Sequence, residues 1–400
     1  MQKNERIVLI LLAALNFTHI IDFMIMMPLG NHLITYFNIS GQKFSIILAA
    51  YSISAFVSSF TASFFVDNFD RKKVLLFGYS GFLIGTLLCG LAPSADLLLL
   101  ARIVAGLFGG LIGAQVMSIV ADIFPYERRG AAMGYLMTAF SVASIVGVPF
   151  GLFLADMFSW HAPFLLVAIL GVVLVPFLWR YIPSMTDHLE NKTNSNTKSP
   201  FDTFKNIFTQ KNQVNGLLLS AFLMLGHFLI IPFITPYMEF NVGFERSQIK
   251  YIYVVGGLVT LFTAPLVGKY ADKYGKLKIF TISAILSLIP ILFITNMPII
   301  PFYYVLIVTG FWFIVANGRN IAASTMVSNV VLTENRGSFM SINSAIQQLF
   351  TGIASIIAGL IVVTKKPNPQ LLHYSYVGYL SLILIVCCIF LAKRLKTSGG

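Results

Sequence analysis

The stretch VDNFDRKK at residues 66–73 separates two long apolar runs. A similar stretch, ADKYGKLK at residues 271–278, lies 205 positions further on. Two other pairs match at nearly the same spacing: HIIDFMIMMP (19–28) with HFLIIPFITP (227–236), and ERRGAAMG (127–134) with ENRGSFMS (334–341). Because each pair occupies corresponding places, the sequence predicts two halves that repeat one another in the same orientation.

The composition is that of a membrane protein. Of the 400 residues, 57% are hydrophobic and only 10% are charged, whereas about a quarter are charged in ordinary soluble proteins. Many apolar runs reach the length of roughly 18 residues or more that a membrane-spanning helix needs. The first run is too long for a removed signal peptide and lacks its small-residue cleavage site. We therefore expect an all-α, polytopic membrane protein.

The apolar runs predict twelve membrane-spanning helices in two six-helix bundles. The bundles are expected at 1–182 and 213–400, joined by a polar cytoplasmic linker at 183–212 that contains an amphipathic helix with Phe201, Phe204 and Phe208 on one face. The predicted spans are 7–29, 45–66, 74–92, 97–121, 131–155, 162–181, 214–237, 249–268, 277–296, 301–326, 338–363 and 374–393.

The net charge of +12 could suggest nucleic acid, but its distribution argues against that partner. Most of the 27 Lys and Arg residues fall in short segments on the side of the membrane that holds the N-terminus. This bias predicts that both termini are cytoplasmic. The three cysteines lie within apolar runs and show neither metal-ligand nor disulfide spacing, so we expect no metal site.

The two loops quoted first carry a recognisable motif. The stretch SFFVDNFDRK (63–72) resembles the pattern G-x-x-x-D-x-x-G-R-K, and GKYADKYGK (268–276) resembles it again at the corresponding loop of the second half. On these motifs the whole chain resembles the major facilitator superfamily, and within it the twelve-helix, sugar-efflux-like branch of drug/proton antiporters. The residues in register are Asp67, Arg71, Lys72, Gly268, Asp272, Gly275 and Lys276; Ser63 and Asp70 replace the two glycines of the first copy.

The resemblance implies a latch that closes the cytoplasmic face and opens as the halves rock. Asp67 and Arg71 are four residues apart and can pair, and the family suggests Asp122 as a third partner. The residues Gly268, Asp272, Gly275 and Lys276 would form the second copy. The alternative is that the basic residues, Lys72 included, only anchor the chain to the cytoplasmic surface.

Asp22 is the one acidic residue placed well inside a predicted helix, and Arg102 lies at a similar depth on helix four. Either charge alone is unfavourable inside a membrane. In one interpretation the two form a permanent structural ion pair. In the other, Asp22 binds the transported proton and Arg102 favours its charged form. His19, one turn before Asp22, is a candidate partner.

Helix five contains the short motif G-x-P-x-G, with Gly147, Pro149 and Gly151, in place of the longer antiporter signature. Small residues allow helices to approach closely and proline bends a helix. Gly106, placed as in the family's helix-four motif, is assigned the same packing role.

The resemblance places the substrate cavity between helices one, four, seven and ten. Its predicted polar residues are His227, Arg319, Gln115, Asn317 and Asn320. A cavity with one acid and two arginines favours anionic or zwitterionic compounds. His19 and His227, at repeat-related positions, could relay protons or contact substrate; alternatively each bonds only a neighbouring helix.

The sequence thus predicts a proton-coupled exporter of small amphiphilic molecules in a bacterial plasma membrane. The expected partners are a small-molecule substrate, protons and the lipid bilayer, with no cofactor besides the proton gradient, and the chain is expected to be a monomer. A sugar or metabolite exporter or uniporter is the alternative within the class; a lipid flippase or membrane sensor is the alternative outside it. No metalloprotease, phosphate-loop or nucleophile-elbow motif indicates an enzyme.

Overall fold

The computed structural model describes residues 3–62, 64, 66–124, 126–186, 207–331, 336–365 and 370–396. Within this part of the chain, twelve helical segments are long and apolar enough to cross a membrane. This confirms the predicted all-α, multi-pass fold. The predicted linker lies mostly outside the described residues, including Phe201 and Phe204 of its proposed amphipathic helix.

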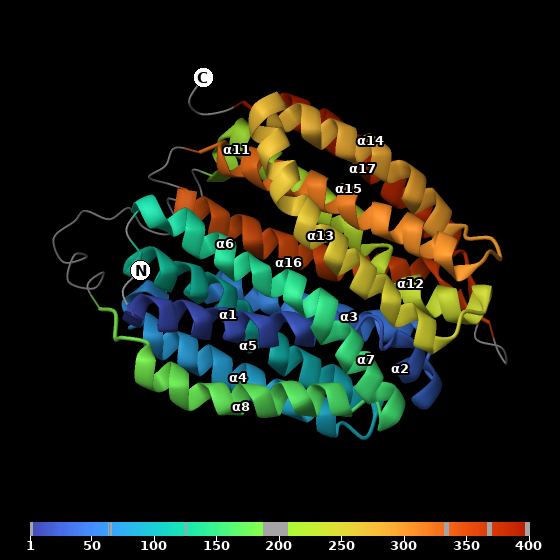
Figure 1. The fold of residues 1–400 in the computed structure, drawn as a ribbon, viewed down its shortest axis with the longest axis horizontal. Helices are drawn as coiled ribbons and strands as arrows, with labels where there is room; N and C mark the ends of the chain where they lie inside the picture. Colours follow the sequence, from blue (N-terminus) through green and yellow to red (C-terminus); the bar gives the residue numbers. More distant parts are fainter. Residues whose placement is uncertain are drawn as a thin grey trace.

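The first half of the chain forms the lower bundle in Figure 1. Its helices are α1 (Lys3–Ile25), α2 (Gly30–Tyr36), α3 (Gly41–Ala62), α4 (Arg71–Leu91), α5 (Ala95–Ile123), α6 (Tyr126–Val142), α7 (Val148–Met157) and α8 (Ala162–Tyr181), with a 3₁₀ turn, η1 (Val66–Asn68), and a π-helical segment, η2 (Ala143–Gly147).

The second half forms α11 (Lys211–Phe228), α12 (Ile231–Tyr237), a π-helical segment η3 (Met238–Val242), α13 (Arg246–Tyr274), α14 (Lys276–Thr295), α15 (Phe302–Ser328), α16 (Arg336–Ile361) and α17 (Tyr374–Arg394). A short antiparallel pair, β1 (Val363–Thr364) and β2 (Leu371–Leu372), connects the last two helices.

Two predicted spans are interrupted. The span expected at 7–29 ends as α1 at Ile25, and the chain turns before α2 begins at Gly30. Pro28 lies in this turn, where it has no backbone N–H to donate and its ring disfavours a continuous helix. The span expected at 214–237 is divided into α11, α12 and η3, with Pro232 at the start of α12.

The motif in helix five produces a local change of helix geometry. Pro149 lacks the N–H that would bond to the fourth preceding carbonyl, and the π-helical segment η2 ends just before it. A Cβ atom on Gly147 would lie 2.6 Å from Ile21, and one on Gly151 would lie 2.7 Å from Ile25. These residues therefore allow helix five to pack closely on α1, as the sequence predicted.

The two bundles have separate cores that meet along two helix pairs. The buried residues of the main second-half cluster all lie between Ile207 and Ala392. Those of the three first-half clusters all lie between Val8 and Met185. Across the interface, α3 packs on α16, where a Cβ on Gly352 would lie 2.6 Å from Ile53. Helix five packs on α13, where a Cβ on Gly257 would lie 2.6 Å from Ile145.

The contact between α13 and helix five is not continuous along their length. Both chain termini lie at one end of the molecule, which we call the termini end, and α2 and α12 lie at the other, the α2/α12 end (Figure 1). Toward the termini end, a Cβ on Gly134 of α6 or Gly268 of α13 would have no atom within 4 Å among the described residues. Helices α6 and α13 thus meet toward the α2/α12 end and diverge toward the termini end (Figure 1).

A substitution at Gly106 tests the close packing of α5 on α3. A Cβ atom there would lie 2.3 Å from the Tyr51 carbonyl oxygen and 2.1 Å from Ser54 Oγ, so Gly106→Ala should lower stability by about 1–3 kcal/mol through overpacking. Gly113→Ala on the same helix is the matched control, because nothing lies within 4 Å of its Cβ position. Thermal unfolding in detergent should show a lower midpoint for Gly106→Ala alone; equal midpoints would contradict the packing assigned to Gly106.

Candidate functional site

An ion pair lies in the interior of the first bundle. Arg102 of α5 donates from Nη1 to Asp22 Oδ2 of α1 at 2.7 Å, and Thr86 of α4 donates to Asp22 Oδ1 at 3.1 Å. Asp22 and Arg102 are both 0% exposed. The juxtaposition expected from their depths is therefore confirmed, and the carboxylate joins three helices.

Tyr51 and His19 extend this pair into a network. The Tyr51 ring of α3 lies over the Arg102 guanidinium, with 4.3 Å from Cζ to the ring centroid. This is a cation–π contact, and it is worth more when water is excluded. The Tyr51 hydroxyl is 2.8 Å from His19 Nε2. His19 is thus connected to the pair through Tyr51 rather than through a hydrogen bond to Asp22.

The carboxylate of Asp22 and the guanidinium of Arg102 depend on each other for their stability. Removing two charges from water is costly, and their mutual attraction offsets this only when the geometry is good and further hydrogen bonds are made. Here the short contact to Arg102, the Thr86 hydroxyl and the Tyr51 ring supply those interactions. Loss of either charge would leave the other buried without a counter-charge.

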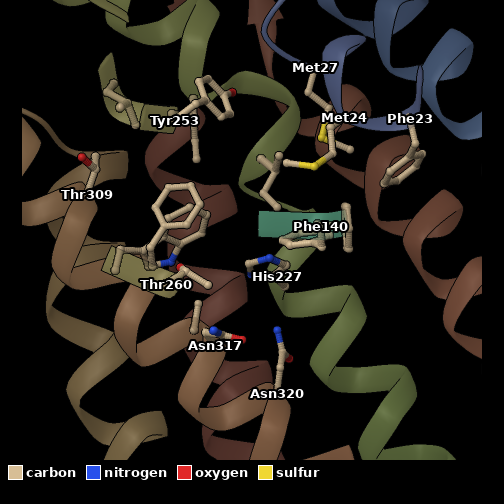
Figure 2. Close-up of a pocket in the computed structure, with 17 residues that line it drawn as sticks. Phe23, Met24, Met27, Phe140, His227, Tyr253, Thr260, Thr309, Asn317 and Asn320 are labelled. Atoms are coloured by element: carbon tan, nitrogen blue, oxygen red, sulfur yellow. The ribbon is translucent and has the colours of Figure 1, made fainter. Parts of the chain in front are cut away.

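A large cavity lies between the two bundles, next to this network. Its empty space, part of which is open to solvent, measures about 930 Å³, and most of its lining is apolar. Figure 2 shows side chains from both halves directed into it. The lining residues come from α1 (Phe23, Met24) and the turn after it (Met27), α6 (Phe140), α11 and α12 (His227, Phe228, Ile231, Ile234), α13 (Ile252, Tyr253, Thr260) and α15 (Thr309, Trp312, Phe313, Ala316, Asn317, Asn320).

Three of the five predicted cavity residues line this cavity, namely His227, Asn317 and Asn320 (Figure 2). Arg319 and Gln115 do not line it, so the prediction that they contribute to the lining is wrong for this cavity. Both are buried, at 0% and 3% exposure. Because Asp22 and Arg102 are also absent from the lining, the described residues around the cavity carry no acidic or guanidinium side chain.

Arg319 lies behind His227. Its Nη2 is 3.1 Å from His227 Nδ1, and its Nη1 donates to Ser287 Oγ of α14 at 3.0 Å. The His227 ring stacks on the Trp312 ring, with 5.3 Å between centroids and 26° between planes. Since a guanidinium can only donate, His227 Nδ1 must accept, and the neutral ring carries its proton on Nε2.

Phe23 connects the cavity with the buried network. It lines the cavity, and its ring lies 5.6 Å from the Tyr51 ring and 6.0 Å from the Phe228 ring of the second half, measured between centroids. Tyr51 in turn covers Arg102. Two aromatic side chains, Phe23 and then Tyr51, thus lie between the cavity and the Asp22–Arg102 pair.

The first motif loop lies at the termini end. Arg71 Nε pairs with Asp122 Oδ2 at 2.5 Å, which confirms the contact that the family analogy suggested. Lys72 lies over the exposed Trp179 ring of α8, 5.9 Å from its centroid. The side chain of Asp67 falls outside the described part of the chain, so its pairing with Arg71 stays a prediction.

Asp70, at the position where the motif has its second glycine, caps the start of helix α4. Its carboxylate accepts hydrogen bonds from Lys72 N at the start of α4, from Ser184 Oγ and from Met185 N. Burial raises the pKa of Asp70, but these hydrogen bonds outweigh burial and hold the pKa below its usual value. The cap therefore stabilises the fold at neutral pH and loses its contribution only as the pH falls through this lowered pKa.

The second motif loop keeps its glycine for a conformational reason. Gly275 joins α13 to α14 with φ +95°, a conformation that side chains disfavour. Asp272 and Lys276 form an exposed pair at 3.8 Å, one turn apart. Gly268 faces open space. The latch role assigned to these four residues stays a prediction.

Polar contacts that the sequence did not reveal join the bundles at the α2/α12 end. The Asn31 side chain of α2 bonds to Glu239 of η3, which also binds Arg246 at 2.7 Å. The Gly41 N–H donates to Thr364 Oγ1 at 2.9 Å. Within the first bundle, His32 pairs with Asp156 at 3.2 Å. These residues lie in turns and helix ends, where the sequence pattern gave no partner.

Comparisons with known proteins agree with this geometry. A family model described as Major Facilitator Superfamily matches residues 12–230 and 216–398. The chain is 24% identical over 380 residues to the uncharacterized MFS-type transporter YceJ of Bacillus subtilis, covering 94% of this chain and 93% of that one. It is 23% identical over 372 residues to multidrug resistance protein 1 of the same organism, covering 90% of each. A solved D-xylose–proton symporter has a TM-score of 0.76 at 16% identity and 98% coverage of each chain.

The dependence of Arg102 on Asp22 gives a stability prediction. Asp22→Asn should lower stability by about 3–5 kcal/mol, because it leaves a buried guanidinium unpaired. The double variant Asp22→Asn with Arg102→Met should recover much of this loss, because it removes both charges. Unfolding of the four proteins (wild type, each single variant and the double variant) in a double-mutant cycle measures the coupling. Additive effects of the two substitutions would contradict a mutually dependent pair.

Proposed function

The chain belongs to the Major Facilitator Superfamily and is therefore a multi-pass membrane transporter of small molecules, and we propose that it couples proton entry to the efflux of small amphiphilic compounds. The observation that carries this proposal is a fully buried Asp22–Arg102 pair that Phe23 and Tyr51 connect to a mainly apolar cavity. Asp22 would be the proton-binding group, and the proton gradient would supply the energy.

The lining of the cavity supports amphiphilic substrates over sugars. Phenylalanine, methionine and isoleucine side chains provide most of its surface, and amides and hydroxyls such as Asn317, Asn320 and Thr260 provide a small polar part. Mainly apolar pockets with a few placed polar groups suit drug-like molecules. A polyhydroxylated sugar would leave many hydroxyls facing apolar side chains without hydrogen bonds, which is unfavourable.

Proton binding to Asp22 would be transmitted through Arg102. A neutral Asp22 no longer balances the guanidinium, so Arg102 must find other partners, and the Tyr51 ring that covers it must move with it. Tyr51 packs on Phe23, and Phe23 lines the cavity. A substrate in contact with Phe23 and a proton on Asp22 would therefore act on the same side chains, which is the requirement for coupling.

The transport step would be alternating access, in which the cavity opens first to one side of the membrane and then to the other. In this structure α6 and α13 diverge toward the termini end, and polar contacts join the bundles at the α2/α12 end. The cavity between them would open to the other side when Asn31 and Glu239, and Gly41 and Thr364, part as the bundles rock. With the termini on the cytoplasmic side, as the charge distribution predicts, this structure would be the state that receives substrate from the cytoplasm.

Reconstitution in liposomes tests the coupling. Internal pH is monitored while amphiphilic compounds of different charge are added, and wild-type protein should show compound-dependent proton movement. Asp22→Asn should reduce this movement by about tenfold or more, because it removes the proton-binding carboxylate. Asp96→Asn, the same change at an exposed carboxylate of α5, serves as the folded comparison. Undiminished proton movement in Asp22→Asn would refute the assignment.

A cross-link tests alternating access. A Cβ atom on Gly41 would lie 3.1 Å from Thr364 Oγ1, which suits a disulfide between Gly41→Cys and Thr364→Cys. Oxidation of the double variant should lower transport by about tenfold or more by holding the α2/α12 end closed, and reduction should restore it. The two single-cysteine variants, treated alike, are the controls. Full transport by a fully cross-linked protein would show that this end need not open.

A further inference from the structure

Arg319 is a buried cation without a carboxylate partner among the described residues. It lies near the middle of α15 and is 0% exposed. Its guanidinium contacts Ser287 Oγ and His227 Nδ1, both uncharged, and its Nε atom has no hydrogen-bond partner in the described part of the chain. Arg102, equally buried, has Asp22. A charge in a membrane interior normally pairs or marks a ligand pathway.

The second bundle has no spare carboxylate near Arg319. Residues 213–400 contain four acids in all, and Asp22 corresponds there to Ile230. Glu239 binds Asn31 and Arg246, Glu245 caps α13, and Asp272 pairs with Lys276, all at helix ends. The fourth, Glu334, lies outside the described residues, and in sequence it follows the end of α15.

His227 connects the Arg319 guanidinium with the cavity. Because Arg319 donates to Nδ1, the His227 ring presents Nε2–H as a donor, and this residue lines the cavity (Figure 2). The Trp312 ring stacks on it, and Trp312 Nε1 has no acceptor among the described residues. The His227 N–H donor at the cavity, with an unbalanced guanidinium behind it, forms a site for an acceptor with negative charge.

We propose that the cavity binds an amphiphilic organic monoanion, with its carboxylate at His227 and its apolar body among the aromatic side chains. The carboxylate would accept from His227 Nε2–H and supply the counter-charge that Arg319 lacks. Phe23, Phe140 and Phe313 would contact the body of the molecule. This names the substrate class of the proposed exporter and rests on that function, but binding itself requires no proton gradient.

Equilibrium binding of three matched probes tests the charge preference. The full-length protein in detergent is titrated by calorimetry at neutral pH with 2-naphthoate, 2-naphthamide and 2-naphthylmethylammonium, which share one ring system. The carboxylate should bind about tenfold more tightly than the amide, a difference of about 1.4 kcal/mol, and the ammonium should bind most weakly. An amide that binds as tightly as the carboxylate, or an ammonium that binds best, would overturn the proposal.

Variants identify the source of the preference. Arg319→Met should bring naphthoate affinity down to that of naphthamide while leaving naphthamide affinity unchanged, so the amide also reports correct folding. Arg319→Lys should retain part of the preference. Should Arg319→Met fail to fold, His227→Phe keeps the ring on Trp312 and removes the donor, with the same expected loss. An unchanged preference in the folded variants would overturn the proposal. Because no gradient is present, a failure here is distinct from a failure of proton coupling.

Discussion

The ion pair between Asp22 and Arg102 is the constraint on which the first bundle depends. Neither charge is stable alone in a membrane interior, so α1 and α5 must hold them 2.7 Å apart, with α4 supplying Thr86. Tyr51 can cover the guanidinium only because Gly106 and Gly109 allow α3 to approach α5 closely. In the proposed coupling, a proton on Asp22 would remove the charge that balances Arg102.

The repeat in the sequence conceals an electrostatic difference between the halves. His19 and His227 occupy corresponding positions, but His19 bonds to Tyr51 in a network that contains an acid, whereas His227 bonds to Arg319 in one that does not. Only His227 lines the cavity. This asymmetry favours a division of labour, in which the first half binds the proton, the second binds the substrate, and Phe23 lies between them.

Much of the fold could be predicted from the sequence because hydrophobic length and the repeat determine it. The twelve helices followed from the apolar runs, and the similar depth of Asp22 and Arg102 followed from their places within those runs. No pattern in the sequence indicated Tyr51 or Thr86, because ordinary packing residues acquire these roles only through helix rotation. Rotation also explains why Asn317 and Asn320 line the cavity while Arg319, between them in the sequence, faces α14. The contacts of Asn31 and Glu239 join distant turns that no periodic pattern relates.

The claim that Asp22 binds the coupling proton is tested most directly by infrared difference spectroscopy of the reconstituted protein as the proton gradient is applied. If Asp22 binds the proton, a carbonyl band of a protonated carboxylic acid should appear with the gradient in wild-type protein and be missing in Asp22→Asn. The same band in both proteins would assign the proton to another group, and would leave the Asp22–Arg102 pair as a permanent structural element of the first bundle.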